Sequence, residues 1–271
     1  MQRNPDKPDV ETAFCKSLDM SVIIRSLSME ESGKGMMIEP AATKTDLCND
    51  CAHGCNIDRT AQTGICGAGP VAEVSHFGPH FGEEPPIGGS VGCGNIFFSR
   101  CSLACIYCQN WQISQHVVAA RKMDSVQLSE VMLGFERDGL GAVGLVSPTS
   151  HLPTIIPAIR EAKNAGLSIP VVYNTSSYDS LEAIRSLAGL VDIYLPDMKY
   201  GTDHAGAVLS GIRSYSSSAK LAIQEMLKQV GHLKIDDDGL ARRGTLVRHL
   251  VLPGDSADTT LVLEWIAKTL G

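Results

Sequence analysis

From residue 92 to the C-terminus, short apolar runs alternate with segments whose apolar residues recur every three or four positions. The runs predict buried strands and the recurring pattern predicts amphipathic helices. The expected strands are 95–99, 142–147, 169–174, 191–197 and 245–252. The expected helices are 125–138, 152–165, 180–187, 217–230 and 256–270. This alternation predicts an α/β fold built on a parallel sheet.

The first 91 residues do not follow this alternation. Residues 1–46 carry scattered charges and show no sustained period, so we expect them to be poorly ordered. Residues 47–69 contain four closely spaced cysteines, and the Gly- and Pro-rich residues 70–91 predict a loop. The expected organisation is thus a poorly ordered segment (1–46), a cysteine-rich metal-binding segment with its linker (47–91) and a main α/β domain (92–271).

Composition narrows the class of protein. A chain of 271 residues, 44% of them hydrophobic, suits one large domain with a small appendage. The net charge of −7, without a dense Lys/Arg block, argues against binding to nucleic acid or an anionic membrane surface. The apolar runs are too short to span a membrane. Nine cysteines without a secretion signal predict a cytoplasmic protein whose thiols ligate metal rather than form disulfides.

Three cysteines follow the first expected strand of the main domain. Cys101, Cys105 and Cys108 have the spacing C-x3-C-x2-C. Protein cysteines normally ligate all four irons of a four-iron cluster, so a set of three leaves one iron open to another ligand. A zinc site or a trio of unligated buried thiols would also suit this spacing.

This spacing, with Tyr107 before the last cysteine, resembles the signature of the radical S-adenosylmethionine enzymes. The run Cys-Gln-Asn-Trp at 108–111 is typical of the relatives of pyruvate formate-lyase activating enzyme. The resemblance covers about residues 47–271. It implies a partial (β/α) barrel and a 4Fe-4S cluster whose open iron binds S-adenosylmethionine. Reductive cleavage of that cofactor would give a 5′-deoxyadenosyl radical, which takes hydrogen from a substrate.

The resemblance also implies partners and cofactor contacts. The expected reductant is a flavodoxin or ferredoxin, and one candidate substrate is a glycyl-radical protein. The expected cofactor-binding residues, most of them where strands end, are Tyr107, Thr149, Ser150, Asn174, Ser176, Asp197, Lys199 and Arg248. Helix capping or a surface ion pair would also explain several of them. The resemblance does not identify a catalytic residue.

A second group of cysteines precedes the first. Cys48, Cys51, Cys55 and Cys66 have the spacing C-x2-C-x3-C-x10-C, and four thiolates can close a metal site completely. Structural zinc and an auxiliary iron–sulfur cluster both fit, as do a purely stabilising role and a role in electron transfer. Cys93 lies outside both groups and is expected to be a small buried residue.

The barrel of the family has a sixth strand after the helix that corresponds to 256–270, and this sequence ends before it. We therefore expect an exposed sheet edge beside the active site. The alternative to an enzyme is a truncated, catalytically impaired iron–sulfur or zinc-binding module that serves interaction or redox transfer.

Overall fold

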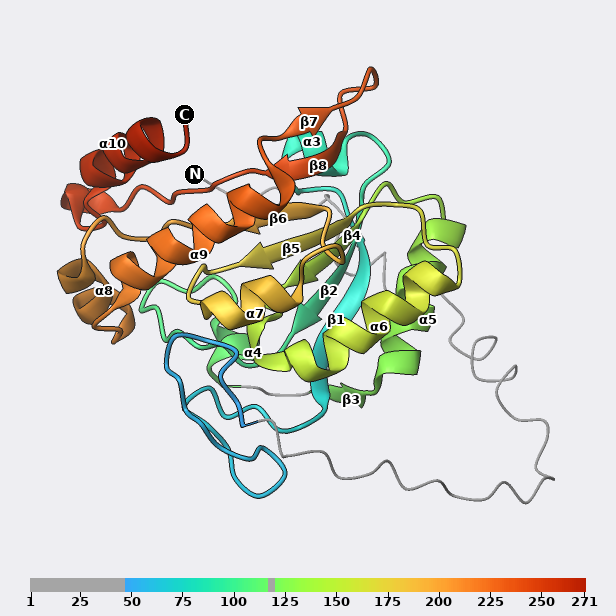
Figure 1. The fold of residues 1–271 in the computed structure, drawn as a ribbon, viewed down its shortest axis with the longest axis horizontal. Helices are drawn as coiled ribbons and strands as arrows, with labels where there is room; N and C mark the ends of the chain where they lie inside the picture. The colour runs from blue at the N-terminus through green and yellow to red at the C-terminus, as the bar shows by residue number, and fades with distance from the viewer. Residues whose placement is uncertain (1–46, 117–119) are drawn as a thin grey trace, which may run out of the picture. The chain divides into compact units, whose positions relative to one another are not determined.

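Eight strands form one mixed sheet in the part of the chain that this computed structural model describes, residues 47–116 and 120–271 (Figure 1). The segment expected to be poorly ordered, 1–46, lies outside the described residues. The strands are β1 (Ala72–His80), β2 (Cys93–Phe98), β3 (Arg121–Met123), β4 (Val143–Val146), β5 (Val171–Thr175), β6 (Ile193–Pro196), β7 (Lys234–Ile235) and β8 (Ala241–Thr245). Their order across the sheet is β3-β1-β2-β4-β5-β6-β8-β7.

The centre of the sheet is parallel, as the alternating pattern predicts. Strands β2, β4, β5, β6 and β8 pair in parallel, with Leu145 of β4 between Ile96 of β2 and Tyr173 of β5. Both edges are antiparallel, through β1 and β3 at one side and β7 at the other. The order runs from β3 to β7 without closing on itself, so the fold is a mixed α/β sheet and the barrel remains a prediction.

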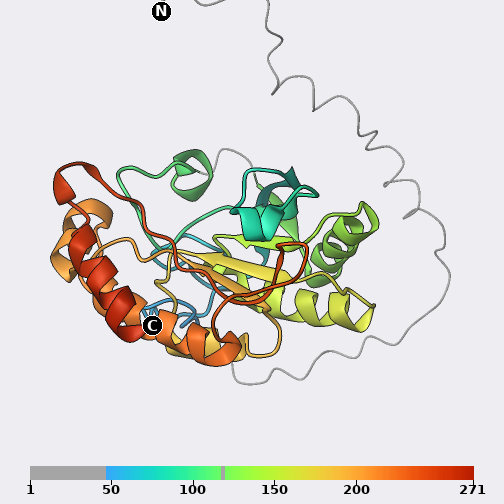
Figure 2. The ribbon, with the colours of Figure 1, turned by 90° about the horizontal axis from the view of Figure 1, so that it is seen from above.

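Helices cover one face of the sheet. The helices are α3 (Pro85–Gly88), α4 (Trp111–Ser114), α5 (Ser125–Arg137), α6 (Leu152–Asn164), α7 (Leu181–Ser186), α8 (Asp203–Ser210), α9 (Tyr215–Val230) and α10 (Thr259–Thr269). Figure 2 shows α5, α6 and α9 on one side of the sheet and the short α3 and α4 on the other. Five of these helices match the expected ones to within three residues at either end, whereas α3, α4 and α8 are additions.

Helix α5 shows why the predicted helices form. Asp124 accepts a hydrogen bond from the backbone N–H of Gln127, whose side chain accepts from the N–H of Asp124, a reciprocal cap. Its apolar residues Leu128, Met132 and Phe135 face the sheet and are buried in the main core. The helix ends before Gly139, which has a φ of 79°.

The prediction of a loop throughout 70–91 is wrong, because the nine-residue β1 lies within it. Strand β1 pairs antiparallel with β2 from Val74 to His80, despite Gly78 and Pro79. Only residues 72–74 also pair with β3, so the proline lies where β1 is an edge on that side. An edge tolerates a residue without an N–H, and the Gly/Pro content therefore does not prevent a strand here.

The last expected strand, 245–252, is also displaced. Strand β8 covers Ala241–Thr245, and beyond it only Arg248 forms a bridge, with Asp197. The exposed Arg242 and Arg243 hide this strand from an apolar pattern. The outer side of β8 pairs with β7, so this edge is partly covered rather than exposed as expected.

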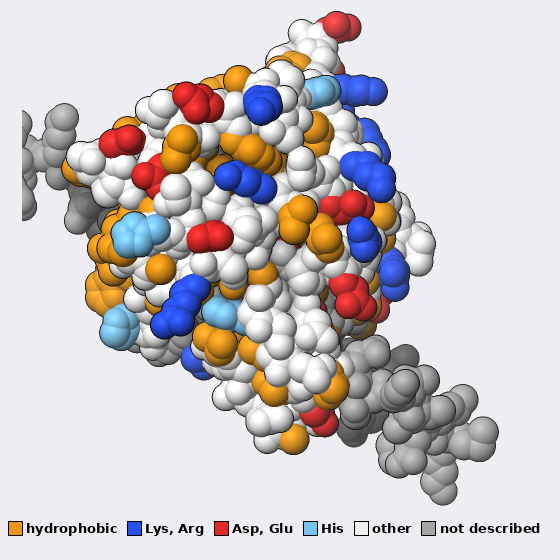
Figure 3. Space-filling view, turned by 60° about the vertical axis from the view of Figure 1, so that its left-hand side comes forward, with side chains coloured by type: hydrophobic (Ala, Val, Ile, Leu, Met, Phe, Trp, Pro, Cys, Tyr) orange, Lys and Arg blue, Asp and Glu red, His pale blue; other side chains and the backbone are white. Residues whose placement is uncertain are grey.

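The surface shows mixed charge. On the face in Figure 3, Lys and Arg side chains are interspersed with Asp and Glu. Within the described residues, none of the helices has the length and apolar character needed to cross a membrane.

Candidate active site

A cavity of about 490 Å³ lies where the parallel strands end. Parallel strands place their carboxyl ends at one edge of the sheet, so residues distant in the sequence meet there. Among the residues that line it are Cys101, Cys105, Tyr107, Cys108, Ser147, Asn174, Ser176, Asp197, Lys199 and Arg248. The structure thus brings all three cysteines of the first group and six of the eight expected cofactor-binding residues to one cavity.

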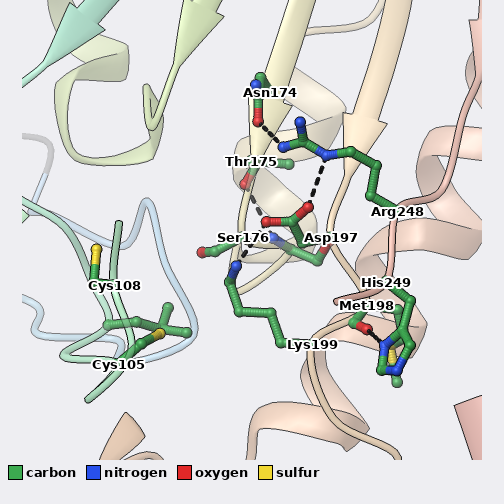
Figure 4. A network of polar contacts seen from close by, with 12 residues as sticks. Cys105, Cys108, Asn174, Thr175, Ser176, Asp197, Met198, Lys199, Arg248 and His249 are labelled. Carbon is green, nitrogen blue, oxygen red and sulfur yellow. Dashed lines mark hydrogen bonds and ion pairs between the residues drawn. The ribbon is translucent and has the colours of Figure 1, made fainter. Parts of the chain in front are cut away.

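A polar network crosses one wall of the cavity (Figure 4). The Nε of Arg248 donates to Asp197 Oδ1 at 2.9 Å, and its Nη2 donates to Asn174 Oδ1 at 2.6 Å. Lys199 Nζ donates to the other carboxylate oxygen of Asp197 at 2.6 Å. The network therefore ties the ends of β5 and β6 to the segment that follows β8.

The charges of this network stabilise one another. Burial alone would raise the pKa of the Asp197 carboxyl, but Lys199 and Arg248 together hold it below its usual value. Burial likewise opposes the charge of Lys199 and Arg248, and the Asp197 carboxylate raises the pKa of both. Buried charges persist when they are paired in this way, so the three groups stay ionised at neutral pH.

The first cysteine group is surrounded by hydrogen-bond donors. Ser210 Oγ donates to Cys105 Sγ at 2.9 Å, and the backbone N–H of Leu103 donates to Cys101 Sγ at 3.4 Å. Cys108 Sγ lies 3.3 Å from Ser114 Oγ. Hydrogen bonds to cysteine sulfur tune an iron–sulfur cluster, so these contacts are compatible with a cluster on this loop.

The first cysteine group places sulfur ligands at the edge of the cavity. Cys101, Cys105 and Cys108 all line it, and three thiolates suit a four-iron cluster with one open iron. Among the described residues, no three Cys, His, Asp or Glu side chains form a group that could hold a single metal ion.

Tyr107 lines the cavity, and its hydroxyl donates to Tyr200 OH at 2.7 Å. Thr149 and Ser150 are buried and do not line the cavity. Thr149 Oγ1 donates to the buried carboxylate of Asp179 at 2.8 Å, which turns this hydroxyl inward. Ser147, from the same strand end, faces the cavity instead.

Two acidic residues of the wall, Glu83 and Glu84, were not predicted. Glu84 Oε1 accepts from Arg248 Nη1 at 3.1 Å, and Glu83 Oε1 accepts from Asn95 Nδ2 at 2.8 Å. Burial raises the pKa of the Glu83 carboxyl. The sequence signal that could have identified them is a pair of adjacent acidic residues inside an otherwise Gly- and Pro-rich stretch.

The second cysteine group lies near the first loop, since Cys66 lines one pocket together with Cys101. Arg59 Nη2 donates to Cys48 Sγ at 2.8 Å and lies 3.1 Å from Asp50 Oδ2. A Cβ on Gly64 would meet Cys55 Sγ at 3.1 Å, so the chain passes close to this sulfur. Cys93 is fully buried in β2, as expected.

Comparisons with known proteins give distant likenesses. No family model matches the chain. The uncharacterized protein MJ0674 of Methanocaldococcus jannaschii is 29% identical over 247 residues, which are 87% of this chain and 66% of that protein. The chain thus spans just under two thirds of that relative. The crystal structure of QueE from Escherichia coli aligns with a TM-score of 0.35 and 12% identity, over 73% of this chain and 91% of that one.

Proposed function

We propose that the protein is a radical S-adenosylmethionine enzyme. The observation that carries this proposal is that Cys101, Cys105 and Cys108 share one cavity with the Asp197–Arg248 network. A three-cysteine loop alone suits several metals. A three-cysteine loop that faces cationic and amide side chains across a cavity suits a four-iron cluster whose cofactor carries an amino-acid group.

When bound, a four-iron cluster and S-adenosylmethionine would supply one-electron cleavage to a 5′-deoxyadenosyl radical, which takes hydrogen from a substrate. The three cysteines would hold the cluster, and the hydroxyl of Ser210 would stabilise the Cys105 thiolate. Arg248 and Lys199 provide positive charge for a carboxylate.

Other residues of the same cavity wall would provide the remaining contacts to the cofactor. Asn174 and Ser176 would bind hydroxyl groups of the cofactor, and Asp197 would hold both cations in position. The sequence resemblance suggests a cytoplasmic enzyme reduced by flavodoxin or ferredoxin. It also suggests hydrogen abstraction from a protein glycine, as in a glycyl-radical activase.

The test is anaerobic reconstitution with iron and sulfide, followed by reduction with S-adenosylmethionine present. We expect 5′-deoxyadenosine to form with the wild-type protein and not with Cys105→Ala. Cys93→Ala is the matched control, because Cys93 is buried outside both cysteine groups. A wild-type protein with a complete cluster that yields no 5′-deoxyadenosine would falsify the proposal.

A second candidate function is a metal-binding interaction or redox module without catalysis. It is supported by the guanidinium of Arg248, which already has partners in Asp197, Asn174 and Glu84. These three contacts would also be expected if Arg248 had only a structural role, as a clasp between neighbouring segments. This alternative predicts that S-adenosylmethionine leaves the EPR spectrum of the reduced cluster unchanged.

A further inference from the structure

Three residues that line the candidate active-site cavity lie just beyond the ends of two parallel strands. Strand β5 ends at Thr175 and β6 ends at Pro196. The cavity residues Ser176, Asp197 and Lys199 follow them. Backbone groups beyond a strand end lose the ladder partners that strand residues have, so buried ones need other partners. The positions of these three side chains therefore depend on what holds the backbone there.

A single buried hydroxyl replaces the missing ladder partners. Tyr215 is fully buried, and its OH donates to the carbonyl oxygens of Ser176 and Asp197, each at 2.8 Å. The same oxygen accepts from the backbone N–H of Lys199 at 2.9 Å. In the described part of the chain, none of these three backbone groups has a backbone partner. The hydroxyl therefore joins the segment after β5 to the segment after β6.

Neighbouring residues hold the ring of Tyr215 in place. It stacks against Tyr178, with centroids 6.3 Å apart and planes inclined by 15°, and meets Tyr200 edge-on at 5.0 Å. A Cβ on Gly206 would lie 2.7 Å from the Cβ of Tyr215, so α8 approaches this side chain closely because residue 206 has no side chain. Burial raises the pKa of the Tyr215 phenol well above its usual value, which keeps the hydrogen on the oxygen at neutral pH.

The turn after β5 needs support from its surroundings. Ser177 has a φ of 64°, a left-handed conformation that is unfavourable for a residue with a side chain. Such a conformation persists where surrounding contacts fix it. The N–H of Ser177 donates to Thr175 Oγ1 at 3.1 Å, and Tyr215 holds the carbonyl of Ser176 just before it. These two contacts fix the turn that carries Ser176.

The segment after β6 is held through two peptide groups. The carbonyl of Asp197 and the N–H of Lys199 both bond to Tyr215 OH. The side chains of the same two residues form an ion pair at 2.6 Å, beside Ser176 on the cavity wall (Figure 4). A shift of this short stretch of backbone would therefore move the carboxylate and the ammonium group together.

We propose that the Tyr215 hydroxyl is a positioning group for cofactor binding, which holds the backbone so that Ser176, Asp197 and Lys199 face one ligand in the cavity. This inference rests on the proposed function. Tyr215 does not line the cavity, so it acts through these three residues and not by touching the ligand. Side chains that are already in place lose less conformational freedom when a ligand binds, which favours affinity.

Tyr215→Phe tests the proposal, because it removes the hydroxyl and keeps the buried ring. We expect the reconstituted variant to hold as much iron and sulfide as the wild type. Its dissociation constant for S-adenosylmethionine, measured by equilibrium dialysis, should rise about tenfold. At saturating cofactor, its rate of 5′-deoxyadenosine formation should return to that of the wild type. A lower rate at every cofactor concentration, with an unchanged dissociation constant, would overturn the inference.

Tyr194→Phe is the matched control. Tyr194 is also fully buried, does not line the cavity, and donates its hydroxyl to Gln229 Oε1 of α9 at 2.8 Å. Urea unfolding should show a comparable loss of stability in both variants, since each loses a buried hydroxyl. Only Tyr215→Phe should change the dissociation constant. An equal rise in the two variants would mean that loss of stability, and not positioning, is the cause.

A measurement on the wild type does not depend on the folding of either variant. The N–H of Lys199 lies outside the strands, yet its bond to Tyr215 should make its exchange with deuterium as slow as that of strand amides. Exchange as fast as that of an exposed loop amide would overturn the inference.

The two proposals can fail separately. Wild-type protein that binds S-adenosylmethionine but forms no 5′-deoxyadenosine with a complete, reduced cluster would contradict the proposed function. The comparison of dissociation constants would still stand. Wild-type protein that forms 5′-deoxyadenosine, together with a Tyr215→Phe variant that binds the cofactor equally tightly, would contradict only the role of Tyr215.

Discussion

Arg248 Nε lies 2.9 Å from Asp197 Oδ1, although 51 residues separate them in the chain. The same carboxylate binds Lys199 through its other oxygen, so one acid positions two cations on the cavity wall. Because neither cation extends freely into solvent, a carboxylate ligand would meet them already oriented. A binding site and a structural clasp therefore differ in the effect expected when Arg248 or Lys199 is substituted.

Arg248→Lys should weaken binding of S-adenosylmethionine while keeping the positive charge. Lysine cannot reproduce the separate bonds to Asn174 and Glu84, so the planar fork is lost. We expect the dissociation constant to rise by roughly tenfold, which corresponds to about 1.4 kcal/mol. Equilibrium dialysis of the reconstituted protein measures it. An unchanged constant would mean that Arg248 acts only as a clasp.

Lys199→Met should likewise weaken cofactor binding, and Lys163→Met is the matched control. Lys163 pairs with Asp192 at 3.1 Å, just before β6 begins, at the opposite end of the strands. Both changes remove a lysine from a partly buried ion pair with aspartate. If the two variants bound the cofactor equally well, charge at the cavity would not matter.

Ser210→Ala should make the reduction potential of the first cluster more negative. Ser210 Oγ donates to Cys105 Sγ, and hydrogen bonds to cluster sulfurs raise the potential. The control is Ser216→Ala, another buried serine, whose hydroxyl donates to the carbonyl of Gly201 instead. An EPR-monitored redox titration of the reconstituted protein should show a shift for the first variant and none for the second.

Gly144→Ala should destabilise the protein, because the added Cβ would clash with Asn95 Oδ1. Asn95 is fully buried and holds Glu83, so it has little room to move. We expect a loss of about 1–3 kcal/mol in the free energy of unfolding, the usual cost of overpacking. Gly78→Ala, where a Cβ meets nothing within 4 Å, is the control. Urea unfolding compares the two.

The helices could be predicted from the sequence because their signals are local. The apolar period and the stop at Gly139 define α5 without reference to the rest of the chain. Strand β8 could not be predicted, because Arg242 and Arg243 are polar and its position depends on pairing with β6 and β7. Pairing between distant segments has no signature within either of them.

The difference between local signals and contacts between distant segments also explains which residues of the site could be predicted. Asn174, Asp197 and Arg248 were predicted from the resemblance, and the parallel strand order explains why they meet. Glu84 was missed because its partner Arg248 lies 164 residues away. Thr149 does not line the cavity, because its hydroxyl donates to the buried carboxylate of Asp179. This contact forms only in the folded chain, so the sequence does not reveal it.

His151 should make the folded protein sensitive to mild acid. Its Nε2 lies 2.7 Å from the carbonyl of Ser99, and burial lowers the pKa of its imidazole to about 4. The unfolded chain binds a proton near the ordinary value of about 6.5, so stability is complete above that pH and falls as pH approaches 4. At pH 5.5 the loss relative to pH 7.5 should be roughly 1 kcal/mol.

His151→Gln should remove this contribution, because an amide can still donate to Ser99 O but does not titrate. Urea unfolding at pH 7.5 and pH 5.5 measures the change in each protein. His204→Gln, at an exposed position of α8, should leave the difference between the two pH values as it is in the wild type. If His151→Gln also left that difference unchanged, the buried imidazole would not be the acid-sensitive group, and the proton would have to bind elsewhere on the folded chain.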